Sequence, residues 1–239
     1  MTNNYTVILF DFGGTLDTNG VHWSVKYYEA FKKVFPSLDF KIYSDLFVKA
    51  DEKLRLYAGN ISDYYELLTK QFSLQCDLLN QKLNLHISQK QYETMLKEIY
   101  WDVRDNINSS RRIISSLKQN YKIGVVSNFY GNLPIICNNL NLLNLLDIVV
   151  DSVKIGYSKP DPGIFLFALK SLNSSPEECI VVGDSYERDI KPSKQIGCKT
   201  IWLKGKSWKE ESEPNCADFI ITTLSEIKEI LTLKTKIQK

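Results

Sequence analysis

A short apolar run that ends in an aspartate and two glycines lies near the start of the chain, at TVILFDFGGTLD, residues 6–17. Four strand-forming residues precede Asp11, and a run this short and this apolar is typical of a buried strand in a parallel sheet. A carboxylate at the carboxyl end of such a strand lies where open α/β sheets bind ligands. Gly13 and Gly14 let the backbone turn sharply, and the hydroxyl of Thr15 can hydrogen-bond an oxyanion. The stretch therefore makes Asp11 the first candidate for chemistry.

The composition is that of an ordinary globular protein. The 239 residues are 44% hydrophobic and 24% charged, which is enough chain to bury a sizeable core. A net charge of +2 gives no strong field, so neither nucleic acid nor an anionic membrane is an expected partner. The N-terminus lacks a signal-peptide pattern, and no apolar run reaches membrane-spanning length. We therefore expect a cytoplasmic protein, as a monomer or a homodimer.

The cysteines and histidines argue against a zinc site. The five cysteines are odd in number and widely spaced, without a CxxC pair, so buried free thiols are expected. The two histidines, His22 and His86, are too few for a multi-histidine metal centre.

Two kinds of hydrophobic pattern divide the chain. From about residue 21 to residue 108, apolar and aromatic residues recur at helical spacing, with helices expected at 25–35, behind an N-cap at Ser62, and from Ser88 to Ile99. From Ser109 onwards, short apolar strands alternate with helices, which predicts βαβ units and a doubly wound, mostly parallel α/β sheet. A helix is expected near 109–117, and strands are expected at 7–10, 122–126, 146–150, 179–182, 200–203 and 218–221.

Several of these strands end in a residue suited to chemistry. Asp11, Ser127 and Asp184 each follow a strand, and Lys159 lies on the loop after a fourth strand. Parallel strands bring their carboxyl ends to one edge of a sheet, so these side chains should converge. Two carboxylates, a hydroxyl and an ammonium group suit a divalent cation and an anionic substrate. Mg²⁺ takes carboxylates, carbonyls and water, so Asp11, Asp184 and the carbonyl of Gly13 are its candidate ligands.

The segments that carry these residues resemble the four motifs of the haloacid dehalogenase-like (HAD) hydrolase superfamily. They are DFGGTL from Asp11, the strand end VVSN with Ser127, SKPDPGIF with Lys159, and VVGDSYERDI with Asp184 and Asp189. The resemblance implies a Rossmann-like core. It also implies a helical cap inserted after the first strand. The predicted core is residues 1–17 and 109–239, and the predicted cap is residues 18–108.

The resemblance also implies an activity and a role for each residue. The protein would be a Mg²⁺-dependent hydrolase acting on a small phosphorylated molecule, with Asp11 as the nucleophile of an aspartyl intermediate. Ser127 would hydrogen-bond the transferred group, and Lys159 would neutralise charge between that group and Asp11. Asp184 would hold the ion. Asp189 is counted with Asp11, Gly13 and Asp184 as a metal-site residue, expected to orient the groups around the ion through water or hydrogen bonds or to contact the ion directly. The alternative for Asp189 is a helix-start acid. The expected phosphate-binding residues are Gly14, Thr15 and Asn128.

The first motif departs from the family pattern at one position. Family phosphatases usually carry a second aspartate two residues after the nucleophile, as general acid and then base, and here that position is Gly13. Glycine transfers no proton, and a positioned acid or base contributes roughly 10² to 10⁴ in rate. We therefore expect slower hydrolysis of ordinary alkyl phosphates. The metal site should survive, because this residue gives only its carbonyl oxygen to the cation.

The resemblance leaves four functions open. The first is a phosphatase that handles the proton through another group or water and prefers good leaving groups, such as acyl or aryl phosphates. The second is a phosphonate-cleaving enzyme, in which a cap lysine (Lys26, Lys49 or Lys53) would form a Schiff base. The third is a dehalogenase, a branch that does not depend on a metal-binding acid such as Asp184. The fourth is a binding protein without catalysis.

Two residues on the hinge into the cap are candidates for the missing proton transfer. Asp17 and His22 are near enough in sequence to reach the site. Asp17 is more simply interpreted as a turn or linker residue, and His22 is equally suited to packing in the cap. The aromatic residues considered for the pocket wall are Trp23, Tyr27, Tyr57 and Tyr64.

Overall fold

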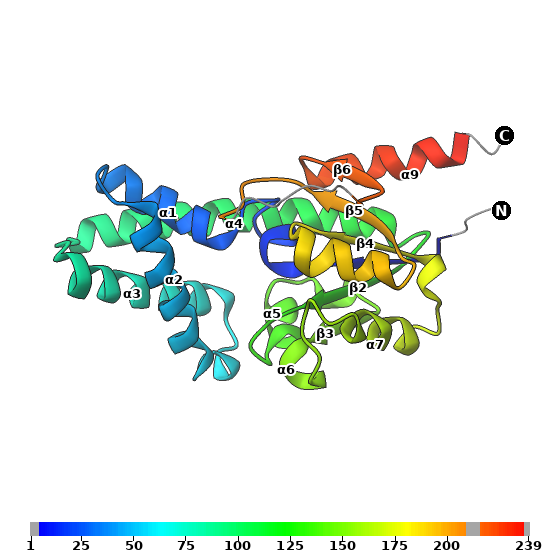
Figure 1. Ribbon diagram of the computed structural model, residues 1–239, viewed down its shortest axis with the longest axis horizontal. Helices are drawn as coiled ribbons and strands as arrows, with labels where there is room; N and C mark the ends of the chain where they lie inside the picture. Colours follow the sequence, from blue (N-terminus) through cyan, green and yellow to red (C-terminus); the bar gives the residue numbers. More distant parts are fainter. Residues whose placement is uncertain (1–4, 209–215, 237–239) are drawn as a thin grey trace.

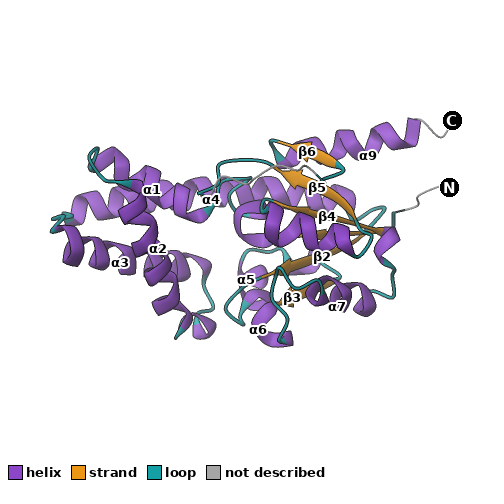
Figure 2. Ribbon diagram, viewed as in Figure 1, coloured by secondary structure: helices purple, strands orange, loops and turns teal. Residues whose placement is uncertain are grey.

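The structure, a computed structural model, describes residues 5–208 and 216–236 (Figure 1). Residues 1–4, 209–215 and 237–239 of the predicted core lie outside the described residues. Figure 2 shows the described strands gathered at one end of the molecule and the helices α1, α2 and α3 at the other. Within the described part, no helix combines the length and apolar composition needed to cross a membrane.

A parallel sheet of six strands forms the core, in the order β3-β2-β1-β4-β5-β6. Every neighbouring pair in this order is parallel, which confirms the predicted doubly wound α/β fold. Phe10 of β1 lies opposite Val125 of β2 and Val182 of β4. This register brings the ends of the three strands to the same edge. The strands are β1 (Val7–Phe10), β2 (Lys122–Ser127), β3 (Ile148–Asp151), β4 (Cys179–Gly183), β5 (Lys199–Leu203) and β6 (Phe219–Ile221).

The side chains of β1 alternate between two apolar layers. Ile8 and Phe10 join the core that includes residues of α4 and α5, whereas Val7 and Leu9 join the core that includes residues of α7. All four side chains are fully buried. A central strand covered on both faces has no solvated side, which explains why its sequence is continuously apolar rather than alternating. The helices of the core are α5 (Leu133–Asn139), α6 (Ser152–Ile155), α7 (Gly163–Ser171), α8 (Lys191–Gln195) and α9 (Ile227–Lys236).

Three helices, together called the cap helices below, form the other end: α1 (Trp23–Val34), α2 (Phe40–Arg55) and α3 (Tyr64–Leu83). Aromatic rings fill the space between them, with Phe31 stacked on Phe72 at a centroid distance of 5.1 Å. The sequence pattern did not resolve α2 as a separate helix. The N-cap of α3 is Asp63 rather than Ser62, because the Asp63 carboxylate accepts the N–H of Glu66 at 2.8 Å.

α4 (Gln89–Leu117) is a single helix of 29 residues. The prediction of two separate helices in this range was therefore wrong. Ser109 and Ser110 interrupt the apolar pattern, but Ser110 is buried and its hydroxyl donates to the carbonyl oxygen of Leu16 at 2.7 Å. A buried polar group with a partner does not end a helix. The predicted domain boundary after residue 108 falls inside α4, which runs from the cap helices to the sheet (Figure 1).

Two short helical segments lie next to β4. Ser175 and Glu178 form a capping box at the start of a 3₁₀ helix, Pro176–Glu178, which leads directly into β4. After β4 and the residues Asp184 and Ser185, a wide helical turn, Tyr186–Ile190, precedes α8.

We expect Ser110→Ala to lower the free energy of unfolding by about 1–3 kcal/mol, because the buried carbonyl of Leu16 loses its partner. Urea unfolding measures the change. Ser115→Ala is the matched control, since Ser115 is exposed on the same helix and reports helix propensity alone. Equal effects of the two substitutions would contradict a tie between α4 and the loop after β1.

Candidate active site

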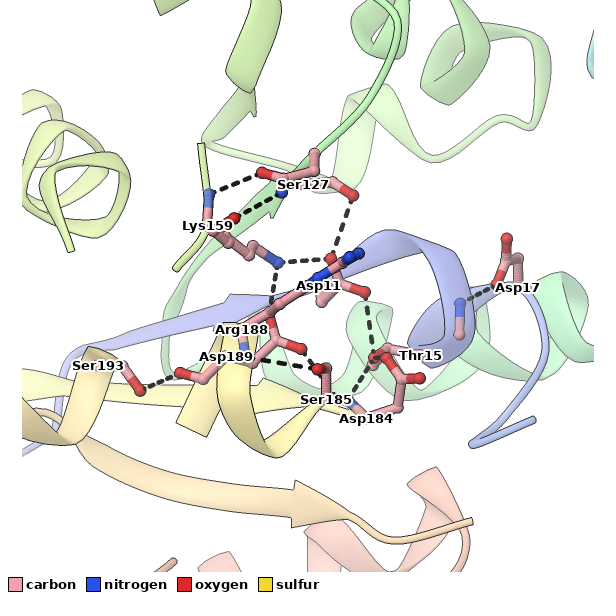
Figure 3. A network of polar contacts seen from close by, with 12 residues as sticks. Asp11, Thr15, Asp17, Ser127, Lys159, Asp184, Ser185, Arg188, Asp189 and Ser193 are labelled. Atoms are coloured by element: carbon pink, nitrogen blue, oxygen red, sulfur yellow. Dashed lines mark hydrogen bonds and ion pairs between the residues drawn. The ribbon is translucent and has the colours of Figure 1, made fainter. Parts of the chain in front are cut away.

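The site forms where the carboxyl ends of β1, β2 and β4 meet (Figure 3). Asp11 follows β1, Ser127 is the last residue of β2, and Asp184 follows β4. The hydroxyl of Ser127 donates to Oδ1 of Asp11 at 3.1 Å. Asp11, Asp184 and Asp189 each offer a carboxylate oxygen, and these oxygens lie within 4.8 Å of one another. The fold thus brings together residues that are far apart in the sequence.

Lys159 joins this cluster from the loop between α6 and α7. Its Nζ lies 2.6 Å from Oδ1 of Asp11 and 2.6 Å from Oδ1 of Asp189. Burial acts to lower the pKa of Lys159, but the charges and hydrogen bonds of Asp11 and Asp189 raise the pKa above its ordinary value. The ammonium group is therefore charged, and it offsets negative charge on the Asp11 oxygen that it contacts.

The carboxylates carry more negative charge than Lys159 balances. Burial and the charges of Asp11 and Asp189 raise the pKa of Asp184 well above its ordinary value. Burial also raises the pKa of Asp189 to about 6, against the opposing effect of Lys159. A divalent cation with a preference for oxygen ligands, such as Mg²⁺, would favour the ionised carboxylates here. The donor set therefore fits the ion expected from the sequence.

Both oxygens of Asp189 already have partners in the protein. Oδ1 accepts from Lys159, and Oδ2 accepts the N–H of Ser185 at 3.1 Å. Asp189 thus orients the lysine and the loop after β4, which is more than a helix-start acid would do. Direct contact between Asp189 and an ion stays a prediction.

Gly14 and Thr15 act on the acidic residues rather than facing the open site. Gly14 has φ = +98°, and a Cβ on it would collide with the carboxylate of Asp184. The hydroxyl of Thr15 donates to Oδ1 of Asp184 at 3.2 Å and accepts the N–H of Asp184 at 3.0 Å. Thr15 therefore fixes Asp184 next to Asp11. Contact of Gly14 or Thr15 with a phosphate stays a prediction.

Asn128 holds the backbone of Lys159 in place. Its Nδ2 donates to the carbonyl oxygen of Lys159 at 2.9 Å, and its Oδ1 accepts the N–H of Lys159 at 2.8 Å. Because both the oxygen and the nitrogen of the amide bond the backbone of Lys159, the structure gives Asn128 a positioning role. Contact of Asn128 with a phosphate stays a prediction. This pairing joins two loops, so sequence alone gave no sign of it.

Asp17 is the most enclosed acid beside the site, at 1% exposure. Its Oδ1 accepts the N–H of Gly14 at 2.8 Å. Its Oδ2 accepts from Trp23 Nε1 and from the hydroxyl of Tyr64, both at 2.8 Å. Burial outweighs these three donors and raises the pKa of Asp17 to about 6. The prediction of a plain turn residue does not account for this environment.

A cavity of about 600 Å³ lies between the sheet edge and the cap helices, and Asp11, Gly13, Ser127 and Lys159 contribute to its wall. Of the four aromatic candidates, Trp23 and Tyr64 line it. Tyr27 is fully buried and packs against Trp23 at a centroid distance of 5.1 Å. Tyr57 is not among the described lining residues.

Several lining residues were not identified from the sequence. Helical spacing shows which residues share a face of a helix, but not which face meets the sheet. Arg188 could have been found, because it lies in the segment VVGDSYERDI between Asp184 and Asp189. The missed residues include Phe47, Asp51, Arg55, Gln71, Arg188 and Trp208.

One polar contact joins α2 to the core at the wall of the cavity. The hydroxyl of Tyr130 donates to Oδ1 of Asp51 at 2.6 Å, and Arg55 pairs with Oδ2 of Asp51 at 2.9 Å. The guanidinium of Arg55 also lies over the Tyr130 ring, 5.3 Å from its centroid. Burial, followed by the charge of Asp51, raises the pKa of Tyr130 well above its ordinary value, so the phenol keeps its proton and donates.

The predicted Schiff-base lysines do not face this cavity. Lys26 pairs with Asp102, while Lys49 and Lys53 are exposed. None of the three is among the described lining residues. His22 does line the cavity, but its Nδ1 accepts the N–H of Ser24 as the N-cap of α1.

Comparison with known proteins agrees with this geometry. A glyceraldehyde 3-phosphate phosphatase of Pyrococcus furiosus is 36% identical over 135 residues, which are 54% of this chain and 55% of that protein. A protein of the same name from Methanocaldococcus jannaschii is 34% identical over 93 residues, 38% of this chain and 40% of that protein. The chain thus spans about half the length of these relatives, or less.

The fold and the family model give the wider match. The solved structure of a HAD phosphatase from Thermococcus onnurineus superposes with a TM-score of 0.54 at 20% identity, covering 95% of this chain and 97% of that chain. Residues 5–197 match the haloacid dehalogenase-like hydrolase family. This match confirms the resemblance drawn from the four motifs, and the chain belongs to the haloacid dehalogenase-like hydrolases.

Proposed function

We propose that the protein is a Mg²⁺-dependent phosphatase that hydrolyses a small phosphorylated molecule through a covalent intermediate on Asp11. The observation that carries this proposal is the asymmetric environment of the Asp11 carboxylate. Oδ1 accepts from Ser127 and Lys159. Oδ2 lies 3.5 Å from the hydroxyl of Thr15, which also bonds Asp184. One oxygen thus faces a cationic partner, and the other faces the acidic side of the site.

This asymmetry suits a carboxylate that attacks phosphorus with one oxygen and faces an ion with the other. In the first step Oδ1 of Asp11 bonds to phosphorus, and the bond from phosphorus to the leaving oxygen breaks. Lys159 and Ser127 offset the negative charge of the transferred group. In the second step water attacks phosphorus, the bond to Asp11 breaks, and inorganic phosphate leaves. Bound Mg²⁺, held by Asp11, Asp184 and the carbonyl of Gly13, would supply further positive charge to the phosphoryl oxygens.

The cavity wall includes cationic groups that suit the anionic part of a small substrate, beside the acidic cluster that a divalent ion would neutralise. Arg188 and Lys159 contribute cationic side chains to this wall, and Trp23, Tyr64 and Trp208 contribute aromatic surface. The names of the relatives, both phosphatases of a phosphorylated triose, support the same class of substrate. Lys26, Lys49 and Lys53 are not among the described lining residues, so they give the phosphonate-cleaving alternative no support. The dehalogenase branch does not depend on a metal-binding acid, so this alternative does not explain the carboxylate cluster.

Replacement of the nucleophile is the direct test. We expect Asp11→Asn to lower kcat by at least about 10³-fold on p-nitrophenyl, acetyl and sugar phosphates with Mg²⁺, because an amide does not form the acyl phosphate. Hydrolysis is measured by phosphate release. Asp105→Asn is the control, since Asp105 is an exposed aspartate on α4. Turnover that persists in Asp11→Asn would remove this residue from the nucleophile role.

Binding of the metal ion can be tested without measuring turnover. We expect beryllium fluoride to raise the Tm of the wild-type protein only when Mg²⁺ is present, because both must bind the folded state together. In Asp184→Asn the rise should be lost, since the carboxylate that would hold the ion is gone. Thermal melts of wild type, Asp184→Asn and Asp105→Asn, with and without Mg²⁺, provide the comparison. An undiminished rise in Asp184→Asn would contradict a metal site at this position.

A further inference from the structure

Position 13 is open toward the cap helices. Gly13 has φ = −78° and ψ = 116°, a backbone conformation that any residue adopts. Among the residues that the structure describes, a Cβ built there meets only the indole of Trp23, 3.9 Å from both Cδ1 and Nε1. The N–H edge of this indole therefore borders the space that a side chain at position 13 would enter.

The same N–H group is hydrogen-bonded to Asp17. Trp23 Nε1 donates to Oδ2 of Asp17 at 2.8 Å, so the Asp17 carboxyl lies one hydrogen bond beyond the open space at Gly13. Asp17 lines the same cavity as Asp11 and Lys159. Its orientation is fixed from the other side by Gly14 and Tyr64. The chain thus lacks a carboxyl group at position 13, but the carboxyl group of Asp17 lies on the far side of the Trp23 N–H.

We propose that Asp17, positioned by Trp23 and Tyr64, is the proton donor to the leaving group and then the base for the attacking water. This inference rests on the proposed phosphatase function. Asp17 supplies what Gly13 lacks, from four residues further along the same loop. Trp23 and Tyr64 are positioning residues, since they act on the substrate through Asp17.

The proton balance of the two steps is complete. In the first step the neutral carboxyl of Asp17 carries its proton on Oδ1, because Oδ2 already accepts from both Trp23 and Tyr64. Oδ1 gives this proton to the leaving oxygen as that oxygen separates from phosphorus and Asp11 bonds to phosphorus. The product alcohol departs, and Asp17 remains as a carboxylate. In the second step Asp17 takes a proton from water as the water oxygen bonds to phosphorus. Asp11 is released as a carboxylate, inorganic phosphate leaves, and Asp17 is neutral again.

The electrostatic surroundings of Asp17 suit both roles. With its pKa raised to about 6 by burial, both protonation states are populated near neutral pH. Besides Tyr64, the titratable groups that interact with it are Tyr27, Asp11 and Asp184. No cation among the described residues forms an ion pair with Asp17, so none holds it in the ionised form.

His22 is the competing candidate, and its contacts favour a structural role. Its Nδ1 lies 2.8 Å from Oγ of Ser24 and accepts the N–H of Ser24 at 3.2 Å, so this nitrogen caps α1. Its ring stacks on Trp208 at a centroid distance of 5.3 Å. His22→Gln is therefore the matched control, because it also replaces a titratable group in the cavity wall.

The test compares leaving groups. We expect Asp17→Asn to lower kcat/KM for an alkyl phosphate, such as glycerol phosphate, by about 10²–10³-fold. For p-nitrophenyl phosphate, whose leaving group departs without a proton, the loss should be less than about tenfold. His22→Gln should not discriminate between the two substrates. In the double variant Gly13→Asp/Asp17→Asn, the new carboxyl should restore at least part of the alkyl phosphate activity.

The pH profile gives a second readout. Because the acid form of Asp17 is needed, kcat/KM for the alkyl phosphate should fall as pH rises through the pKa of Asp17, about 6. The hydroxyl of Tyr64 stabilises the carboxylate and lowers this pKa. Tyr64→Phe should therefore move the falling limb to higher pH. This variant also keeps the inference testable if Asp17→Asn does not fold, as judged by its thermal melt.

The outcomes separate this inference from the proposed function. Equal losses on both substrates in Asp17→Asn, an unmoved limb in Tyr64→Phe, or a wild-type protein that hydrolyses only p-nitrophenyl phosphate would overturn the role of Asp17 alone. Wild-type turnover that does not depend on Asp11, or no turnover of any phosphate, would overturn the phosphatase function and this inference with it.

Discussion

The ion pair between Lys159 and the carboxylates of Asp11 and Asp189 is the interaction on which the site depends. Burying the charges of a lysine and two aspartates costs free energy, because these side chains lose their hydration. Only short ion-pair distances between them offset this loss. Each partner comes from a different segment of the chain. Asn128 holds the backbone of Lys159, and the N–H of Ser185 holds the carboxylate of Asp189. The excess of carboxylates over this ammonium makes the site receptive to a further cation, and the parallel sheet sets the distances between them.

Close approach of two loops requires small residues as well as charges. A side chain on Gly14 would collide with Asp184, and a side chain on Gly183 would collide with Asp189. The loops after β1 and β4 are therefore fitted to each other at two points, and Thr15 closes the contact by bonding both the carboxylate and the N–H of Asp184. The space beside Gly14 is thus filled by the carboxylate of Asp184, a candidate metal ligand. The polar residues of the site are therefore supported by backbone geometry as much as by their own hydrogen bonds.

The convergence of the site residues at one edge of the sheet follows from the sequence because two rules apply together. Short apolar runs form the strands, and parallel strands end at one edge, so the convergence of Asp11, Ser127 and Asp184 needed no coordinates. What the sequence did not reveal depends on contacts between distant segments. The partner of Ser110 is the Leu16 carbonyl, so the continuity of α4 could not be read from its apolar pattern. The amide of Asn128 is used on Lys159, and Arg55 and Gln71 reach the cavity only because α2 and α3 turn those faces toward the sheet.

The cap helices contribute more than a wall over the cavity. Two of the three donors to Asp17 come from them: Trp23 begins α1, and Tyr64 begins α3. The third donor, the N–H of Gly14, belongs to the loop that also carries Asp11. The ionisation of Asp17 therefore depends on how the cap helices sit on the core, because withdrawing Tyr64 or Trp23 removes a hydrogen bond that lowers its pKa. The proposed proton transfer through Asp17 therefore requires the cap helices to be in place, and this couples the proposed chemistry to the contacts that enclose the cavity.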